Sequence, residues 1–322
     1  GRDLTLLELQ NTFDHQLINR IVKNYRHLRK SSKKNHTDCF RIYDRDIPEF
    51  PASADYYAGK FLFQYYSGNE DEEVPYELRE TVEEGIQKVF GMKGNDIYWK
   101  VRKKRSLLEQ YEKLGDEKEF FTVTENGLRF YINLSDYLDS GLFLDHRPVR
   151  ELVKKMSSGK RVLNLFSYTS SITVYAAAGG SSGSVSVDMS NTYTAWAENF
   201  RLNGIDLNKH GLVRDDCLKY LKSAAETGEK FDFIIIDPPT ISRSKKMDGM
   251  FDINSDHYGL ISDCSRLLRD KNSFLLFSTN SRKFKLDANL DDMFSIEEIS
   301  AKTIPEGFRD KKIHKVYLIK LK

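Results

Sequence analysis

The amino-acid sequence predicts an α/β fold, in which a doubly wound and mostly parallel sheet follows a smaller α+β domain. Its 322 residues exceed the usual size of one compact domain, so we expect two domains. From residue 161 onward, short apolar runs alternate with helical patterns, which is typical of a parallel sheet. Two of these runs, 161–166 and 231–237, end abruptly in polar residues or proline, as buried strands do before a functional loop.

The first 36 residues combine a helical pattern with positive charge. Between residues 6 and 34, apolar side chains recur every three or four positions, which predicts one long helix that ends in a basic, Ser-rich linker. The segment holds eight Lys and Arg residues against three acidic residues. We therefore expect residues 1–36 to form a basic helix and linker.

Residues 37–135 are predicted to form the smaller α+β domain. A helix is expected at 75–90, because the segment starts with a proline and stops before Gly91. Segments rich in β-branched and aromatic residues flank this helix and predict strands at 39–43, 56–66, 97–101, 119–124 and 128–134.

Residues 136–322 are predicted to form the larger domain. We expect strands at 161–166, 184–188, 211–214, 231–237 and 273–278. Helices are expected between them at 172–179, 191–203, 217–226 and 256–269. The last two segments, 294–303 and 313–320, have no long helix between them, so they predict an antiparallel pair at the end of the sheet.

The composition argues against membrane, disulfide-linked and metal-binding proteins. Hydrophobic residues make up 39% of the chain, yet no apolar run approaches the roughly 20 residues of a membrane helix. No signal-like segment opens the sequence. The three cysteines, Cys39, Cys217 and Cys264, are far apart, which predicts a reducing, cytoplasmic location. Cys and His residues lack the paired spacing of a metal site, so no metal is expected.

Positive charge is concentrated in three places, although the net charge is only +2. The first is the 1–36 segment, and the second runs from 100 to 105 and includes Arg102, Lys103 and Lys104. Arg243, Lys245 and Lys246 form the third cluster, just past the apolar run 231–237. A single cluster is more often a solvated surface, but three of them favour a nucleic-acid phosphate backbone as the partner.

Three strand ends carry the residues that a nucleoside cofactor requires. Such a ligand needs a tight turn after the first strand, an acid after the second and a contact after the third. Asn164 to Thr169 supply the turn, Asp188 the acid, and Asp216 with Cys217 the third contact. Phe166 and Asp188 are 22 residues apart, close to the expected separation of about 20. The turn lacks the Gly-x-Gly-x-x-Gly pattern, so NAD is not expected.

Together these motifs resemble the RlmK-type family of large-subunit (23S) rRNA guanine-N7 methyltransferases. The resemblance runs from about residue 17 to the end and implies a Rossmann-like class I methyltransferase sheet, S-adenosylmethionine as cofactor and rRNA as partner. In many bacteria this enzyme is the carboxyl-terminal half of a bifunctional protein, so a fused amino-terminal methyltransferase half would lie outside this chain. The motifs that carry the resemblance are Tyr137-Leu-Asp-Ser-Gly-Leu-Phe-Leu-Asp-His-Arg147, Phe166-Ser-Tyr-Thr169, Val187-Asp-Met-Ser190, Asn199-x-x-x-Asn203-Gly204, Asp216-Cys-Leu218 and Asp237-Pro-Pro-Thr240.

The residues around the Asp-Pro-Pro-Thr loop favour N7 of guanine among the possible targets. Methylation of cytosine C5 requires a cysteine nucleophile, and neither 237–242 nor 277–280 contains one. An exocyclic amine is commonly held with a stacked Tyr or Phe, but Thr240 occupies that position. N7 carries a free lone pair and needs no base. Cytosine C5 remains the alternative target, and Ser170, where relatives usually carry Gly, keeps open a non-catalytic RNA-binding or assembly factor.

The resemblance implies a role for each motif. The turn would hold the methionine part of the cofactor, Asp188 the ribose and Asp216 the adenine edge. Met189 and Cys217 are expected as further cofactor-binding residues. Asp145 and Arg147 would reach the cofactor's amino-acid end or form an interdomain ion pair. The expected turn residues are Asn164, Phe166, Ser167, Tyr168 and Thr169; Asp237, Pro238 and Pro239 would line the methyl-transfer gap; Arg243, Lys245 and Lys246 would hold phosphates; and Asn280 and Arg282 would read a flipped base.

Overall fold

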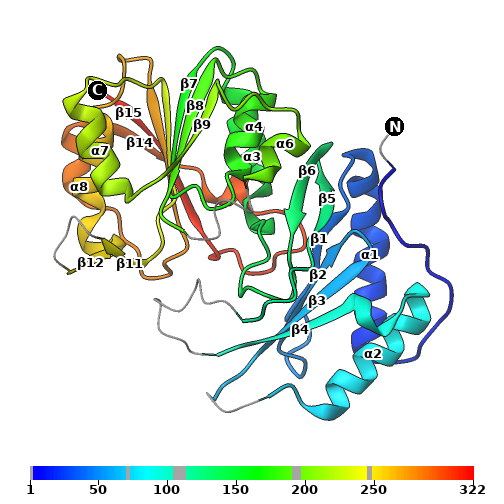
Figure 1. Cartoon of the computed structure of the whole chain (residues 1–322). Helices are drawn as coiled ribbons and strands as arrows, with labels where there is room; N and C mark the ends of the chain where they lie inside the picture. The colour runs from blue at the N-terminus through cyan, green and yellow to red at the C-terminus, as the bar shows by residue number, and fades with distance from the viewer. Residues whose placement is uncertain (1–2, 70–72, 104–113, 191–196, 245–248) are drawn as a thin grey trace. The chain divides into compact units, whose positions relative to one another are not determined.

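The computed structural model describes residues 3–69, 73–103, 114–190, 197–244 and 249–322 (Figure 1). The chain forms two compact units. Unit 1 contains Gly1–Leu144 and Pro305–Asp310, and unit 2 contains Asp145–Ile304 and Lys311–Lys322. This division differs from the predicted ranges, because the first helix belongs to unit 1 and a short carboxyl-terminal segment returns to it. No helix in the described part of the chain is long and apolar enough to span a membrane.

Unit 1 is built on a four-stranded sheet with two helices on one face. The strands β1 (Cys39–Asp44), β2 (Ala52–Tyr57), β3 (Lys60–Tyr66) and β4 (Ile97–Arg102) lie in that order, and only the β3–β4 pair is parallel. Alternate side chains of these strands pack against α1 (Gln16–Lys34) and α2 (Tyr76–Phe90) in one apolar core. A separate hairpin contains β5 (Phe121–Glu125) and β6 (Leu128–Ile132).

The predicted long helix at 6–34 is wrong in its first ten residues. The helix starts at Gln16, where the His15 side chain accepts a hydrogen bond from Leu17 N. The preceding segment is not helical, yet Leu6, Leu7, Leu9 and Phe13 pack against the same core. The Tyr25 hydroxyl donates a hydrogen bond to Leu7 O, which fixes the backbone of this segment to α1. The apolar spacing thus reflects burial, although the backbone that achieves it is not helical.

The predicted single strand at 56–66 is two strands joined by a tight turn. Ala58 and Gly59 both have positive φ angles, 47° and 91°, between β2 and β3. Two consecutive residues with positive φ are typical of a type I′ turn. The twist of this turn matches the twist of the two strands that it joins in a hairpin. The helix predicted at 75–90 is confirmed as α2, which ends at Gly91 in the left-handed conformation.

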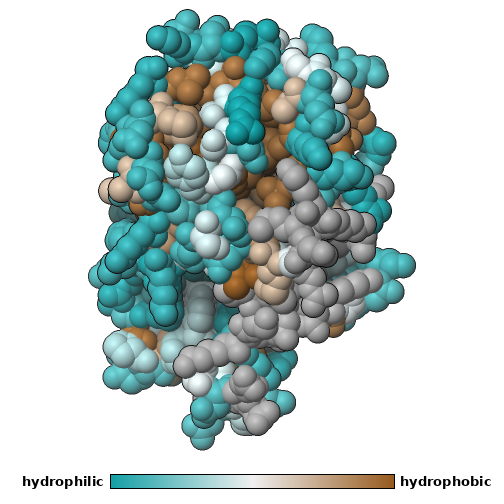
Figure 2. All heavy atoms as spheres, turned by 90° about the vertical axis from the view of Figure 1, so that its left-hand side faces the viewer, coloured by the Kyte–Doolittle hydropathy of each residue, from teal (hydrophilic) through white to brown (hydrophobic). Residues whose placement is uncertain are grey.

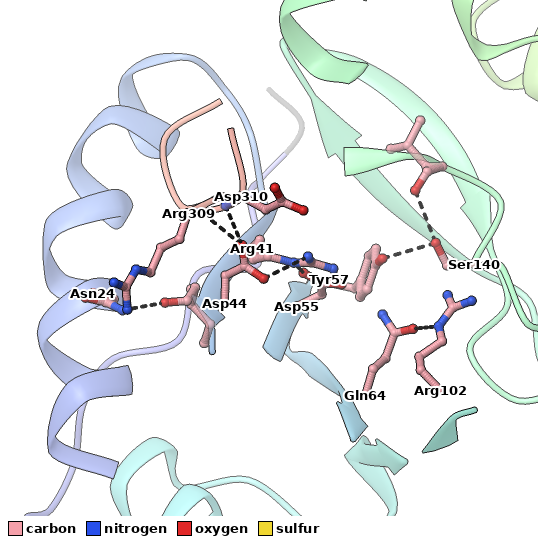
Figure 3. Close-up of polar contacts among 12 residues, drawn as sticks. Asn24, Arg41, Asp44, Asp55, Tyr57, Gln64, Arg102, Ser140, Arg309 and Asp310 are labelled. Carbon is pink, nitrogen blue, oxygen red and sulfur yellow. Dashed lines mark hydrogen bonds and ion pairs between the residues drawn. The ribbon is translucent and has the colours of Figure 1, made fainter. Parts of the chain in front are cut away.

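The segment 305–310 is attached to β1 by buried charges (Figure 3). Arg41 donates to both carboxylate oxygens of Asp55, at 2.8 and 3.1 Å, and its guanidinium stacks on the Phe308 ring at 4.4 Å. The Asp44 carboxylate accepts from the backbone N–H groups of Arg309 and Asp310. Desolvation by burial opposes the charge on Arg41, but the Asp55 carboxylate outweighs it and raises the Arg41 pKa.

Unit 2 contains a seven-stranded sheet in the order β14-β15-β13-β10-β7-β8-β9. Its strands from β7 to β10 and β13 are parallel, and β15 runs antiparallel to both β13 and β14. The predicted antiparallel pair is therefore confirmed. The chain order reverses between β7 and β10, which is where ligands bind in open α/β sheets. The strands are β7 (Arg161–Leu165), β8 (Gly183–Asp188), β9 (His210–Arg214), β10 (Phe233–Ile236), β13 (Phe274–Thr279), β14 (Phe294–Glu298) and β15 (Lys315–Leu321).

Helices cover both faces of this sheet (Figure 1). α3 (Arg147–Met156) and α4 (Ser171–Ala178) pack on one face, and α7 (Cys217–Glu226) and α8 (Ile253–Ser265) on the other. Figure 2 looks onto the side with α7 and α8, where hydrophilic residues surround apolar ones. Of the helix predicted at 191–203, α6 (Glu198–Leu202) is described, whereas 191–196 lie outside the described residues. A hairpin of β11 (Ile241–Ser244) and β12 (Gly249–Asp252) was not predicted.

Candidate active site

The turn between β7 and α4 has an unusual backbone. Phe166, Tyr168 and Ser170 all lie in the left-handed region, with φ of 55°, 52° and 59°. Each such residue costs roughly 1–2 kcal/mol when it is not glycine. Ser170, which stands where relatives usually carry Gly, would fit this turn without strain only at a negative φ, and the structure places it at a positive φ. Strain of this kind persists only where neighbouring contacts hold it, and it is concentrated at ligand sites.

Several groups hold this turn in place. Phe166 N donates to the Cys217 sulfur at 3.3 Å, and Ser167 N donates to Val187 O at 3.0 Å. The side-chain amide of Asn199, which the sequence analysis did not assign to the site, donates to Thr169 O at 3.1 Å. Burial raises the pKa of the Cys217 thiol well above its usual range. Cys217 therefore supports the turn as a neutral, buried side chain.

Asp188, at the end of β8, links the turn to the second strand. Its two carboxylate oxygens accept hydrogen bonds from Tyr168 N and Ser190 N, both at 2.8 Å. Burial raises its pKa, against the opposing effect of these backbone donors. An ionised carboxylate has about four acceptor positions. Asp188 can therefore still accept hydrogen bonds from ribose hydroxyls while it holds the turn.

Three further predicted cofactor residues have structural partners. Asp216 caps α7, because its side chain accepts from Leu218 N at 2.9 Å. Asn164 is buried and donates to the Thr173 hydroxyl, so it joins β7 to α4 inside unit 2. Arg147 pairs with Glu151 one turn further along α3, at 3.6 Å. Met189, in contrast, is 43% exposed beside Asp188.

The Asp-Pro-Pro-Thr loop leaves β10 at the predicted place. The Ser278 hydroxyl at the end of β13 donates to Asp237 Oδ1 at 2.6 Å. Thr240 Oγ1 donates to the side-chain oxygen of Asn280 at 3.0 Å. The two neighbouring strand ends therefore fix both ends of this loop. Asn280 and Arg282 are exposed beyond it.

Two histidines that the sequence analysis did not select lie beside this loop. His146 Nδ1 is 3.6 Å from Asp237 Oδ2, and its Nε2 is 3.7 Å from Asp145 Oδ2. The same Asp145 oxygen accepts from His314 Nδ1 at 2.8 Å, and His314 Nε2 contacts the Thr303 hydroxyl at 2.9 Å. A row of polar side chains therefore runs from Thr303 to Asp237. His146 was visible within the 137–147 motif, whereas His314 is 169 residues from Asp145 and gave no local signal.

Asp145, His146 and His314 also satisfy the donor requirements of a metal ion. Their ligand atoms lie within 4.8 Å of one another. Both ring nitrogens of His314 already have hydrogen-bond partners, namely Asp145 and Thr303. A metal would have to displace the Asp145–His314 hydrogen bond, so we describe the group as a hydrogen-bonded network. Asp145 thus contacts both histidines, and Arg147 pairs with Glu151 of its own helix.

The predicted RNA-binding residues are only partly described. The backbone of Arg243 belongs to β11, and Lys245, Lys246 and Lys104 lie outside the described residues. Arg102 is engaged within unit 1, since it donates to Gln64 Oε1 at 2.5 Å and lies 3.5 Å from Asp139. Lys103 is half-buried. The second basic cluster is therefore partly committed to internal contacts.

Comparison with known proteins identifies the family of this chain. The family model for S-adenosylmethionine-dependent methyltransferases matches residues 41–300. Ribosomal RNA large subunit methyltransferase K of Neisseria meningitidis serogroup B is 46% identical over 308 residues, which cover 94% of this chain and 86% of that protein. Ribosomal RNA large subunit methyltransferase K/L of Hahella chejuensis is 45% identical over 94% of this chain, but this chain spans only 42% of its length.

Solved structures support the fold. SMU.776, solved as a complex with SAH, superposes with a TM-score of 0.71 at 24% identity, over 97% of this chain and 83% of that one. The SAM-dependent methyltransferase from Agrobacterium tumefaciens gives a TM-score of 0.59 at 17% identity, over 88% and 90%. The predicted class I methyltransferase sheet is confirmed. The chain belongs to the S-adenosylmethionine-dependent methyltransferase family, and within it to the group of the ribosomal RNA large subunit methyltransferase K.

Proposed function

We propose that this enzyme methylates N7 of a guanine in large-subunit (23S) rRNA. The observation that carries the proposal is the Asp237 carboxylate at the switch point of the sheet, held by Ser278 and flanked by His146, with no cysteine in either adjoining loop. The relatives with the name methyltransferase K support rRNA as the substrate. Cytosine C5 is disfavoured, because all three cysteines are buried.

The strand ends fit S-adenosylmethionine. Asp188 keeps acceptor positions for ribose hydroxyls, and the strained turn at 166–170 lies directly beside it. Met189 offers an exposed apolar surface next to the same carboxylate. Asp216 caps α7 through one carboxylate oxygen, and its side chain would face the adenine. When bound, the cofactor supplies a methyl group on a positively charged sulfur.

Asp237 would act on the purine and not on a proton. The N7 lone pair forms the new bond as the carbon–sulfur bond breaks and its electron pair stays on sulfur. The positive charge therefore moves to the purine, and no base is required. A carboxylate fixed in advance beside the purine favours this charge without reorganising. Pro238 and Pro239 would hold the loop backbone rigid, so that the nucleophile and the methyl group stay in line.

RNA contacts would come from several parts of the chain. Arg243, Lys245 and Lys246 would hold phosphates near the target, and Asn280 and Arg282 would contact an extruded base. The proposal places the enzyme in the cytoplasm, acting on free rRNA or on a precursor particle. It also includes a second methyltransferase half, fused on the amino-terminal side, as a partner in the manner of the K/L relatives.

The decisive experiment identifies the methylated nucleoside. The protein is incubated with unmodified large-subunit rRNA and labelled S-adenosylmethionine, and the digested RNA is analysed by mass spectrometry. Labelled 7-methylguanosine is expected from the wild type, and Asp237→Ala should abolish it without unfolding the protein. Labelled 5-methylcytidine would overturn the assignment of the target.

A non-catalytic RNA-binding factor is the second candidate, favoured by the positive φ of Ser170 in the cofactor turn. Backbone strain at Ser170 opposes this turn conformation and would weaken binding of the cofactor. Calorimetric titration with S-adenosylhomocysteine separates the two functions. Measurable binding supports the enzyme, and its absence in a folded protein supports the binding factor.

A further inference from the structure

The helix α1 has two sharply different faces. One face is buried in the core of unit 1 and consists of Leu17, Ile18, Ile21, Tyr25, Leu28 and Ser32. The opposite face is exposed and basic. At 100° per residue, the positions that carry its charge lie about half a turn from the buried ones. They are Arg20, Lys23, Arg26, Lys30, Lys33 and Lys34, which we call the α1 basic face.

The positive charge of the α1 basic face is not neutralised within unit 1. α1 contains no acidic residue. Within the described part of the chain, the side chains of these six cations form no hydrogen bond or ion pair. Three acids contact other residues of the helix: Glu306 contacts His27, Glu8 pairs with Arg29 at the edge of the face, and Asp46 accepts a hydrogen bond from Asn24 at 3.0 Å. Core packing explains the buried face of α1 but leaves the exposed cations without a structural role.

We propose that the α1 basic face binds the phosphate backbone of an rRNA duplex, and this inference rests on the proposed function. From Arg20 to Lys34 the helix rises about 21 Å, with a cation on average every few ångströms. A rigid row of cations of that length can neutralise several phosphates at once and release their counterions. The face would thus position the RNA without reading its sequence.

The composition of this face favours a duplex over a single strand. Proteins that bind single strands stack bases on exposed aromatic side chains. The only aromatic residue of α1 besides His27 is Tyr25, and it is fully buried. Duplex RNA, in contrast, is recognised mainly through its shape, phosphates and 2′-hydroxyls. Apart from His27, which contacts Glu306, the α1 basic face offers hydrogen-bond donors and charge but no aromatic side chain.

The test measures RNA binding and does not need methyl transfer. A labelled RNA duplex of about 20 base pairs, longer than one double-stranded RNA-binding module covers, is titrated with the protein at several salt concentrations. The same is done with an unstructured single strand of equal length. The variant Lys23→Gln/Lys30→Gln keeps the helix propensity and removes two exposed charges one heptad apart. The slope of log affinity against log salt should fall by about 2.

A matched control removes two charges elsewhere in unit 1. Lys93 and Lys118 are also exposed, so Lys93→Gln/Lys118→Gln makes the same change of charge outside α1. This control should leave the salt slope unchanged, and the duplex should bind more tightly than the single strand. Equal slopes for the two double variants, or stronger binding of the single strand, would overturn the inference. If methylation fails but the slopes differ as expected, the proposed reaction falls and the binding surface stands.

Discussion

At the residue scale, the cofactor turn shows how far the sequence can predict a site. The positions of Asp188, Asp216 and Asp237 followed from strand ends, because parallel strands bring their carboxyl ends to one edge. The left-handed residues 166, 168 and 170 could not be predicted, since side chains rarely adopt that backbone. His314 could not be assigned either, because its partner Asp145 is 169 residues away in the chain.

Replacement of Ser170 by glycine should stabilise the protein. Glycine adopts φ near 59° without steric cost, so unfolding should require about 1 kcal/mol more. The lost contact from Ser170 Oγ to Ser167 Oγ, at 3.3 Å, reduces this gain. Urea denaturation measures the change. Ala58→Gly, at φ 47° in the unit 1 hairpin, is the matched control. A clear loss of stability in S170G alone would show that the hydroxyl outweighs the strain.

Replacement of His146 should separate its two contacts. The amide nitrogen of Asn occupies roughly the place of Nδ1, which faces Asp237, and that of Gln the place of Nε2, which faces Asp145. If the Asp237 contact positions the carboxylate, His146→Asn should keep most of the kcat, whereas His146→Gln should lose roughly tenfold. Single-turnover methylation of rRNA measures both. Equal rates in the two variants would exclude a positioning role for His146.

The cysteines should not react in the native protein. Cys39, Cys217 and Cys264 are buried, and burial raises the pKa of Cys217 and Cys264 well above the usual range. The thiolate, which is the reactive form, is therefore scarce at pH 8. A thiol reagent should label none of them before denaturation and all three afterwards. Rapid native labelling of one cysteine would revive the cytosine C5 alternative.

At the element scale, the sequence predicted strands and helices well where apolar runs had clear ends. The strands β7, β8, β9, β10 and β13 and the closing antiparallel pair were found at nearly the predicted positions. The start of α1 was missed because Leu6, Leu7 and Leu9 pack on the core from a non-helical segment. The burial of regularly spaced apolar side chains therefore does not by itself distinguish a helix from an extended segment.

The strand β4 contains a buried cation that should make stability depend on pH. Lys100 is buried among backbone carbonyls and donates to Leu138 O at 3.1 Å. Desolvation lowers its pKa from 10.5 to about 8. Between these two values the unfolded chain binds more protons than the folded chain, so stability rises with pH in that window. Below pH 8 the lysine is charged in both states, and its unfavourable contribution is constant.

The comparison with Lys100→Met isolates this effect. Wild-type stability relative to the variant should increase from pH 8 to 10.5 by at most about 3 kcal/mol. Denaturation of both proteins across this range gives the difference, since other titrating groups cancel. A difference that does not change with pH would show that Lys100 keeps its ordinary pKa.

At the scale of the whole molecule, the segment 305–310 is part of unit 1 although its neighbours in sequence belong to unit 2. Gly307 has φ 99°, and an added Cβ would lie 2.3 Å from Arg41 O. Gly307→Ala should therefore destabilise unit 1 by about 2–4 kcal/mol, because backbone must move. Gly127→Ala is the control, with φ 79° and no atom within 4 Å. Equal destabilisation of the two variants in thermal unfolding would show that the 305–310 backbone moves away from Arg41 O without a cost in free energy.

The same segment sets the order of events during synthesis. Residues up to Leu144 of unit 1 are made before unit 2, yet unit 1 is complete only when Asp310 has left the ribosome. At about 5–20 residues per second, synthesis from Leu144 to Asp310 takes roughly 8 to 33 seconds. Until then Asp44 lacks the backbone donors of Arg309 and Asp310, and Arg41 lacks the Phe308 ring. Of the two units, unit 1 is therefore synthesised first but completed only after residues 145–304 of unit 2 have been made, and a nascent chain stalled before residue 305 carries an incomplete unit 1.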